Sequence, residues 1–387
     1  MGKLLTCLGL MSGTSGDGVD ASIIKSDGDL KSQNDNIVEL ICDKFFEYDN
    51  KTIKKIHSLR NKINFQKDLK TYSDEILELQ REITLFHAKV SKEVTNGKNI
   101  DLIGFHGHTI YHNPKEKISK QLGDATLLNQ LLRKKIIFNF RNEDILNGGE
   151  GAPLAPLYHY AIGLQKKITL PFSFLNIGGI SNITAFNFKD INSFKARDIG
   201  PGNCLIDRWI RDNSNLNYDK NGNIAKAGKV NEFILEQVSE HRNRIFEGRS
   251  ILESQRSLDI KNYDISFIRG LNLEDGAATI TEYTAELLSC AIVKFTNFDE
   301  NNNDKKITKL ILTGGGRKNI YLINRLKEKL NKNFEILMID EFKINGDFVE
   351  SQAFAFLAIR SIKNLSISYP NTTGCKKASS GGELFDT

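Results

Sequence analysis

Residues 8–24 read Leu-Gly-Leu-Met-Ser-Gly-Thr-Ser-Gly-Asp-Gly-Val-Asp-Ala-Ser-Ile-Ile, in which a polar turn rich in glycine separates two apolar runs. This pattern is typical of a β-hairpin whose turn, residues 12–18, carries hydroxyl groups at Ser12, Thr14 and Ser15. Glycines let a backbone approach a ligand closely, and hydroxyl and N–H groups donate hydrogen bonds to phosphate oxygens. No Lys-Ser/Thr pair closes the turn, so it is not a Walker-type phosphate loop. The stretch predicts a phosphate-binding hairpin, here called the first glycine turn; an ordinary hairpin turn is the alternative.

The composition is that of a globular chain. Of 387 residues, 40% are hydrophobic and 26% charged, and this length predicts two domains. The net charge of +5 is spread along the chain, which argues against a nucleic-acid partner. Five scattered cysteines without a Cys-x-x-Cys pair predict reduced thiols in a cytosolic protein. No run approaches 18 apolar residues and Met1–Asp20 lacks a basic start, so neither a membrane span nor a signal peptide is expected.

Hydrophobic periodicity predicts alternating strands and helices, and hence an α/β fold. Residues 51–95 have a helical period with charged residues on the other faces, as in helices that cover a sheet. The stretches 141–151 and 220–228 are expected to be loops. Further strands are expected at 37–48, 100–105, 135–140, 168–175, 183–188 and 307–312, and further helices at 122–133, 156–165 and 317–330.

The plan of the first glycine turn recurs in the middle of the chain. Between two apolar runs, residues 176–182 read Asn-Ile-Gly-Gly-Ile-Ser-Asn. This second glycine turn predicts a duplicated two-domain α/β fold with the ligand between the halves. We expect one domain over 1–165 and a second over 166–387, with the last helix packing back on the first domain.

A third glycine turn, Thr313-Gly314-Gly315-Gly316, follows an expected strand. Because it opens an expected helix, its backbone is suited to line a nucleotide. Gly314 and Gly315, together with Gly178 and Gly179 of the second turn, are therefore candidates for the nucleotide side of a site.

Six segments carry a family resemblance. They are Met-Ser-Gly-Thr-Ser-x-Asp-Gly-Val-Asp at 11–20, Gly-x-His-Gly at 104–107, Gly-Gly-Glu-Gly-Ala-Pro-Leu-Ala-Pro at 148–156, Asn-Ile-Gly-Gly-Ile-Ser-Asn at 176–182, Asp-Ile-Gly-Pro-Gly-Asn at 198–203 and Ala-Phe-Ala at 353–355. In this order they resemble the anhydro-N-acetylmuramic acid kinase family, over nearly the whole chain. That family lies in the actin-like, sugar-kinase ATPase superfamily, so the resemblance implies a duplicated ribonuclease-H-like fold with a ligand cleft between the domains.

The resemblance implies a reaction that combines hydrolysis with phosphorylation. Such kinases open the 1,6-anhydro bridge of anhydro-N-acetylmuramic acid and phosphorylate O6 with ATP and Mg²⁺, which gives N-acetylmuramic acid 6-phosphate in peptidoglycan recycling. Water must attack the anomeric carbon while O6 leaves towards the γ-phosphate, which needs a base and a fixed sugar. The resemblance implies a cytoplasmic enzyme that acts on a small sugar and has no nucleic-acid or membrane partner. It is compatible with a homodimer.

The resemblance also assigns a base and a phosphate segment. Asp198, before a Gly-Pro-Gly turn, matches the family's catalytic base; a helix cap or turn aspartate is the ordinary alternative. Mg²⁺ is expected on Asp17 or Asp20 through water, not by direct protein ligation. The residues that match the ATP-phosphate segment are Gly13, Thr14, Ser15, Gly16, Asp17, Gly18, Val19 and Asp20.

Four residues match sugar-side positions of the family: His106, Thr109, Arg141 and Glu350. The guanidinium of Arg141 suits the lactyl carboxylate of muramic acid, and Glu350 is expected to bond sugar hydroxyls. The alternatives are a surface salt bridge for Arg141 and a solvated helix start for Glu350.

Three positions depart from the family. Gly16 stands where leucine is usual, His108 stands where glutamine is usual, and residues 254–259 keep only one basic residue and the serine of a Pro-Pro-Lys-Ser-type segment. The departures at 108 and 254–259 bear on sugar recognition more than on ATP binding, whereas Gly16 adds flexibility and leaves the polar atoms of the turn intact.

Three other functions compete with this reading. A kinase of another sugar would share the nucleotide motifs. A non-catalytic actin-like ATP-binding or scaffold protein would have no use for a base at Asp198. A metal hydrolase on His106, His108 and His112 has ligand-like spacing, but no matching acidic cluster accompanies it.

Overall fold

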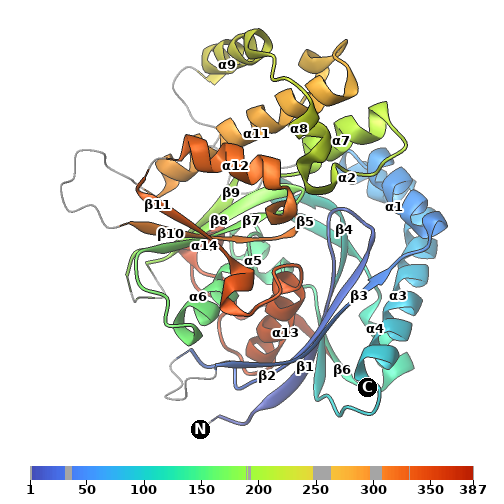
Figure 1. Ribbon diagram of the computed structural model, residues 1–387. Coiled ribbons are helices and arrows are strands. Elements are labelled where there is room, and N and C mark those ends of the chain that lie inside the picture. The colour runs from blue at the N-terminus through green and yellow to red at the C-terminus, as the bar shows by residue number, and fades with distance from the viewer. Residues whose placement is uncertain are drawn as a thin grey trace. The chain divides into compact units, whose positions relative to one another are not determined.

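The chain divides into two compact units, each with its own sheet (Figure 1). Unit 1 comprises Met1–Ile168 and Asp347–Thr387, and unit 2 comprises Thr169–Gly346. The sequence placed 166–387 in a second domain and expected the last helix to pack on the first; residues 347–387 here belong to unit 1. The computed structural model describes residues 2–30, 37–188, 190, 193–246, 263–296, 307–330 and 332–386, so the departure at 254–259 lies outside the described residues.

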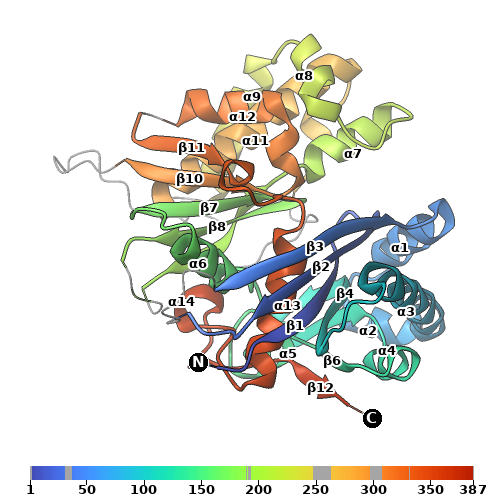
Figure 2. The same cartoon turned by 60° about the horizontal axis from the view of Figure 1, so that its bottom comes forward.

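Unit 1 is built on a seven-stranded sheet with the order β12-β6-β4-β1-β2-β3, and β5 pairs with β4. The first three strands form an antiparallel meander, and β4 and β6 run parallel to β1 on its other side. Figure 2 shows this meander with α13 beside it. The strands are β1 (Leu5–Ser12), β2 (Gly18–Ser26), β3 (Val38–Glu47), β4 (Leu102–Asn113), β5 (Ile118–Leu122), β6 (Lys135–Phe138) and β12 (Glu383–Phe385).

Helices cover both faces of this sheet. One face carries α13, which packs directly on β1, β2 and β4. That close packing requires glycine at two paired positions, because a Cβ on Gly9 would lie 1.9 Å from the carbonyl oxygen of Ser351, and one on Gly104 2.4 Å from that of Phe354. The unit's helices are α1 (Asn50–Lys62), α2 (Gln66–Thr71), α3 (Ser73–Thr95), α4 (Ala125–Leu132), α5 (Asn142–Leu146), α6 (Pro156–Gln165), α13 (Val349–Ile362) and α14 (Pro370–Thr373).

Unit 2 is built on a five-stranded sheet with the order β11-β10-β7-β8-β9. Its apolar core joins Trp209 and Leu288 from helices to Leu310 and Leu312 from the sheet. The strands are β7 (Phe172–Ile177), β8 (Ile180–Phe186), β9 (Lys195–Pro201), β10 (Thr308–Thr313) and β11 (Phe334–Met338), and the helices are α7 (Cys204–Asn213), α8 (Asn223–Ala227), α9 (Glu232–Phe246), α11 (Leu273–Phe295) and α12 (Ile320–Lys329).

The two sheets repeat one topology. An antiparallel meander, β1-β2-β3 or β7-β8-β9, is followed by two strands parallel to its first strand, β4 and β6 or β10 and β11. This correspondence confirms the α/β fold with duplicated ribonuclease-H-like halves of the actin-like kind. The ligand cleft between domains stays a prediction.

Several expected elements differ in extent. The strand expected at 100–105 continues to Asn113, because β5 pairs with its second half. The short helices α5 and α8 lie in stretches that the sequence predicted to be loops. Periodicity cannot detect them, because five residues contain too few turns to give an apolar period. In the part of the chain that the structure describes, no helix has the length and apolar character needed to span a bilayer.

Candidate active site

The first glycine turn joins β1 to β2, as the sequence predicts. Its backbone closes on itself where Gly16 N–H donates to the Gly13 carbonyl at 3.0 Å, and the Ser15 hydroxyl donates to Asp17 at 2.7 Å. Gly16 has a φ of +67°, a conformation that glycine adopts readily. A Cβ on Gly13 would meet only the Ser15 hydroxyl, at 3.9 Å. Thr14 and Ser15 are exposed, so this part of the turn is accessible to a ligand.

Acidic side chains surround Asp20 at the start of β2. Burial raises the pKa of Asp20 to about 8, and the negative charges of Asp17, Glu350, Asp347 and Asp43 add to the shift. Glu350 lies in the first turn of α13, so the close packing of that helix on the sheet brings it into the electrostatic neighbourhood of the first glycine turn. A cation would offset this concentration of negative charge.

Arg141, a candidate for the sugar side, donates to two neutral acceptors. Its Nη2 lies 3.0 Å from Nε2 of His106, and its Nη1 donates to the Gly151 carbonyl at 2.7 Å. His106 Nδ1 lies 2.9 Å from the Gly107 carbonyl, so the proton of the neutral ring belongs on Nδ1 and Nε2 accepts from Arg141. Burial, and then the charge of Arg141, hold the pKa of His106 well below its usual value. The ring packs against that of Phe354 of α13 at a tilt of 38°, with centroids 4.3 Å apart.

Asp144, which the sequence did not single out, shapes the glycine loop beside Arg141. Its carboxylate accepts from Gly151 N–H at 2.7 Å and from the Thr373 hydroxyl at 2.6 Å. A Cβ on Gly149 would lie 2.2 Å from the same carboxylate. The only available signal was an acidic residue shortly before a Gly-Gly-x-Gly run.

Thr109 lies on β4 opposite Gln121 of β5. Its hydroxyl accepts from Gln121 Nε2 at 3.2 Å, and that amide also donates to Ser119 at 2.8 Å. The Ser119 hydroxyl lies 2.9 Å from His112 Nδ1. The pairing of β4 with β5, which sequence reasoning missed, thus gives Thr109 a polar network.

The three histidines of the His-x-His-x-x-x-His spacing have separate partners. His106 contacts Arg141, His112 contacts Ser119, and His108 Nδ1 lies 3.3 Å from the Ser12 hydroxyl. Burial lowers the pKa of His108 and of His112 to about 3 each. Among the described residues, no group of three or more His, Cys, Asp or Glu side chains could hold a metal ion. The geometry gives the metal-hydrolase alternative no support.

Two departures from the family are neighbours in space. A Cβ on Gly16 would lie 3.5 Å from His108 Cε1 and 3.0 Å from Ile56 Cγ2. The imidazole of His108 thus occupies space beside the turn that a longer side chain at residue 16 would also need.

In unit 2, Asp198 lies on β9 opposite Asn182 of β8 and is 9% exposed. Asp198 lies within the strand, so it is not a helix cap. The strand ends at Pro201, and the next residues bond the second glycine turn: Gly202 N–H donates to the Gly179 carbonyl and Asn203 N–H to that of Gly178, both at 2.8 Å. The candidate base is therefore tied to the candidate phosphate turn by a few residues of backbone.

The third glycine turn packs against the end of β7. A Cβ on Gly314 would lie 2.3 Å from Asn176 Oδ1 and one on Gly316 2.2 Å from Ile177, whereas Gly315 has no neighbour within 4 Å of that position. Two of these glycines are thus needed for packing, and Gly315 leaves its backbone accessible. The helix expected from residue 317 begins at Ile320, after a short 3₁₀ turn over Gly315–Lys318.

Arg317 fixes this third turn. The buried guanidinium donates to Asp340 at 2.7 and 2.9 Å and to the Gly314 carbonyl at 2.9 Å. The hydrogen bond from Arg317 lowers the pKa of Asp340.

The second and third glycine turns follow the carboxyl ends of the neighbouring parallel strands β7 and β10. This pairing brings together the candidates Gly178, Gly179, Gly314 and Gly315.

The structure groups the candidate residues by unit. The first glycine turn, His106, Thr109, Arg141 and Glu350 belong to unit 1, while Asp198 and the other two glycine turns belong to unit 2.

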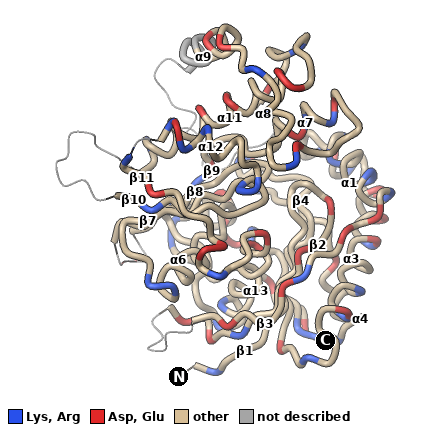
Figure 3. Tube along the Cα trace, viewed as in Figure 1, with Lys and Arg blue, Asp and Glu red and all other residues tan. Residues whose placement is uncertain are grey.

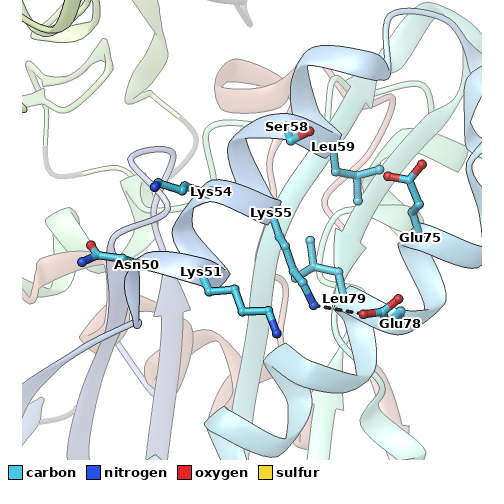
Figure 4. A pocket seen from close by; sticks show the side chains of 9 residues that line it. All are labelled: Asn50, Lys51, Lys54, Lys55, Ser58, Leu59, Glu75, Glu78 and Leu79. Carbon is cyan, nitrogen blue, oxygen red and sulfur yellow. Dashed lines mark hydrogen bonds and ion pairs between the residues drawn. The ribbon is translucent and has the colours of Figure 1, made fainter.

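A groove of about 630 Å³ lies elsewhere, between α1 and α3 (Figure 4). None of the candidate residues lines it. Lysines of α1 pair with glutamates of α3, as in Lys55 with Glu78 at 3.0 Å, and Figure 3 shows charges of both signs along these helices. The residues that line the groove are Asn50, Lys51, Lys54, Lys55, Ser58, Leu59, Glu75, Glu78 and Leu79.

Comparison with known proteins identifies relatives over the full chain. The family model described as anhydro-N-acetylmuramic acid kinase matches residues 5–387. A protein of that name from Pelagibacter ubique (strain HTCC1062) is 49% identical over 386 residues, which cover 99% of each chain. Another, from Zymomonas mobilis subsp. mobilis, is 32% identical over 389 residues, covering 98% of this chain and 99% of the relative.

A solved structure, the activator of the 2-hydroxyisocaproyl-CoA dehydratase from Clostridium difficile with bound ADPNP, is similar over 93% of this chain and 96% of that chain. The TM-score is 0.42 and the identity 11%, which says nothing of the ligand of this chain.

Proposed function

The chain belongs to the anhydro-N-acetylmuramic acid kinase family, and on that basis we propose that it uses ATP to open 1,6-anhydro-N-acetylmuramic acid and phosphorylate O6. The observation that carries the proposal is the family match over residues 5–387, with relatives of the same name across 98–99% of this chain. The product would be N-acetylmuramic acid 6-phosphate. Such an enzyme serves peptidoglycan recycling in the cytoplasm; that location and a homodimeric assembly stay predictions.

In the proposed reaction, a water oxygen bonds to C1 of the sugar while the C1–O6 bond breaks. O6 then bonds to the γ-phosphorus as the bond to the β-phosphate oxygen breaks, which releases ADP. The water proton passes to a carboxylate, for which we assign Asp198. Its position supports this role, because β9 holds it beside Asn182 and the backbone that follows is bonded to the second glycine turn.

On the sugar side, Arg141 is assigned to the lactyl carboxylate. His106 Nε2 and the Gly151 carbonyl orient its guanidinium, and a guanidinium binds a carboxylate through charge-assisted hydrogen bonds. Thr109 and Glu350 are assigned to sugar hydroxyls.

The glycine turns fit the phosphates of ATP. A Cβ on Gly13 or Gly315 would meet nothing closer than 3.9 Å, so a ligand can approach the backbone N–H groups there. Gly16, Gly18 and Val19 are assigned to the same phosphate segment. When bound, Mg²⁺ would neutralise phosphate charge; Asp17 and Asp20 would hold it through water, which fits the negative charge that raises the pKa of Asp20.

The test is to incubate the protein with Mg-ATP and anhydro-N-acetylmuramic acid and to identify the product by mass spectrometry. The 6-phosphate is expected, and in ¹⁸O-water the label should be found at C1. Label on the phosphate would exclude the coupled mechanism. ADP formed only with another sugar would favour the other-sugar kinase, and ATP binding without turnover on any sugar would favour the non-catalytic protein.

A further inference from the structure

The segment that follows β3 supports the first glycine turn at three points. Tyr48 N–H donates to the Asp17 carbonyl at 2.9 Å. Ile56 of α1 packs against Gly16, and one helical turn later Arg60 Nη1 donates to the Thr14 carbonyl at 2.5 Å. Since residues four apart lie on one helix face, α1 presents an apolar contact and a cationic donor to the turn together.

The Arg60 contact determines the direction of an N–H group. In a trans peptide, the carbonyl of one residue and the N–H of the next point in opposite directions. By holding the Thr14 carbonyl, Arg60 turns the Ser15 N–H away from α1. Ser15 and Thr14 are exposed, so this donor is available to a ligand.

An N-cap and ion pairs to α3 hold helix α1, which carries Arg60, in place. The Asp49 carboxylate caps its first turn by accepting from Thr52 N–H at 2.8 Å. Lys55 pairs with Glu82 of α3 at 2.7 Å, and Lys62 with Glu75 at 2.8 Å. The helix is thus bonded to its neighbour on both sides of Arg60.

The charge of Arg60 also reaches the turn. After burial, the positive charges of Arg60 and His57 are the next causes of the low pKa of His108, the histidine that contacts Ser12. The imidazole of His108 therefore stays neutral, and the positive charge of Arg60 acts on groups within the turn.

We propose that Arg60 is a positioning residue for nucleotide binding, which fixes the Ser15 N–H towards a phosphate group and adds positive charge beside it. The inference rests on the proposed function, because it requires a nucleotide phosphate at the first glycine turn. The residue acts through the backbone of Thr14 and takes no part in proton transfer.

The test measures dissociation constants of ATP, ADP and AMP by calorimetry for the wild type, Arg60→Met and Arg60→Lys. We expect Arg60→Met to weaken ATP binding about tenfold, the scale of one charge-assisted hydrogen bond, and AMP binding least. Arg60→Lys keeps the charge and a donor and should recover part of the loss. Lys51→Met, which alters an exposed lysine of the same helix, is the matched control and should bind ATP like the wild type.

Equal weakening for all three nucleotides, or wild-type ATP affinity in Arg60→Met, would overturn the inference. So would an equal loss in Lys51→Met, since it would show that removing any positive charge from α1 weakens ATP binding. If Arg60→Met does not fold, the Arg60→Lys series decides by the same graded loss, ATP most and AMP least. Failure of the wild type to bind ATP would instead contradict the proposed function.

Discussion

Nε2 of His106 lies 3.0 Å from Nη2 of Arg141, and the Nδ1 of the same ring lies 2.9 Å from the Gly107 carbonyl. The second contact determines the tautomer, and the tautomer makes Nε2 an acceptor for the guanidinium. His106 in β4 thereby orients Arg141, which lies 35 residues later in the sequence, just before α5.

The first prediction concerns this pair. His106→Leu removes the acceptor, and we expect KM for the sugar to rise about tenfold while KM for ATP stays unchanged. His106→Gln retains an acceptor oxygen and should have a smaller effect. Because the pKa of His106 is far below its usual value, the ring should add no pH dependence to kcat/KM from about pH 6 to 8. An equal rise in both KM values in steady-state kinetics would argue against the role.

The second prediction concerns Asp198. Asp198→Asn should lower kcat about a thousandfold, within the range of general-base catalysis, because an amide cannot accept the water proton. ATP binding by calorimetry should be nearly unchanged. Asp212→Asn, which alters an exposed carboxylate of α7 paired with Arg208, is the control and should retain activity. Turnover close to wild type in Asp198→Asn would remove Asp198 from the role of base.

The third prediction concerns stability and pH. Burial alone would raise the pKa of Glu282, but hydrogen bonds from Arg325 and Lys329 outweigh it and lower the pKa from its ordinary 4.5. A lowered pKa contributes stability that is present above the unfolded-state pKa and is lost as the pH falls through the folded-state pKa. Glu282→Gln should therefore cost about 2 kcal/mol at pH 7 and clearly less at about pH 3.

Urea unfolding at both pH values measures this difference. Glu328→Gln is the matched control, because Glu328 also pairs with Arg325 but its side chain is 60% exposed, and it should change little. If the difference in free energy of unfolding between wild type and Glu282→Gln is as large at about pH 3 as at pH 7, the ionised Glu282 does not supply this stability.

The fourth prediction concerns Gly16 and His108. Gly16→Leu places a side chain at a φ of +67° beside Ile56 and should cost about 1–2 kcal/mol. In a double-mutant cycle with His108→Gln, we expect a coupling energy of about 0.5–1 kcal/mol, since the two side chains compete for one space. Additive free energies of unfolding would mean that the two departures from the family are independent.

The sequence predicted the three glycine turns because each depends on local chemistry. Gly16 needs a positive φ and Gly314 needs close packing on β7, and both leave a visible glycine between apolar runs. The duplicated topology followed from the same repetition. The position of His106 within a strand did not, because a strand that continues past a glycine looks in sequence like one that ends there.

The partners of the site residues were beyond sequence reasoning. Arg60 is 46 residues from Thr14, on a helix whose basic residues look like an ordinary solvated face. Gln121 became visible only through the register of β4 with β5, and register depends on both strands at once. Short helices such as α5 have no periodic signal.

The packing of α13 on Gly9 and Gly104 has a consequence for the order of events during translation. The central strands of unit 1 are synthesised early, yet one face of their sheet stays uncovered until residues 349–362 have left the ribosome. The last strand among the described residues of unit 2 ends at Met338, and this unit is a continuous insertion within unit 1. The nascent chain can therefore complete the inserted unit before α13 of the host unit has been synthesised.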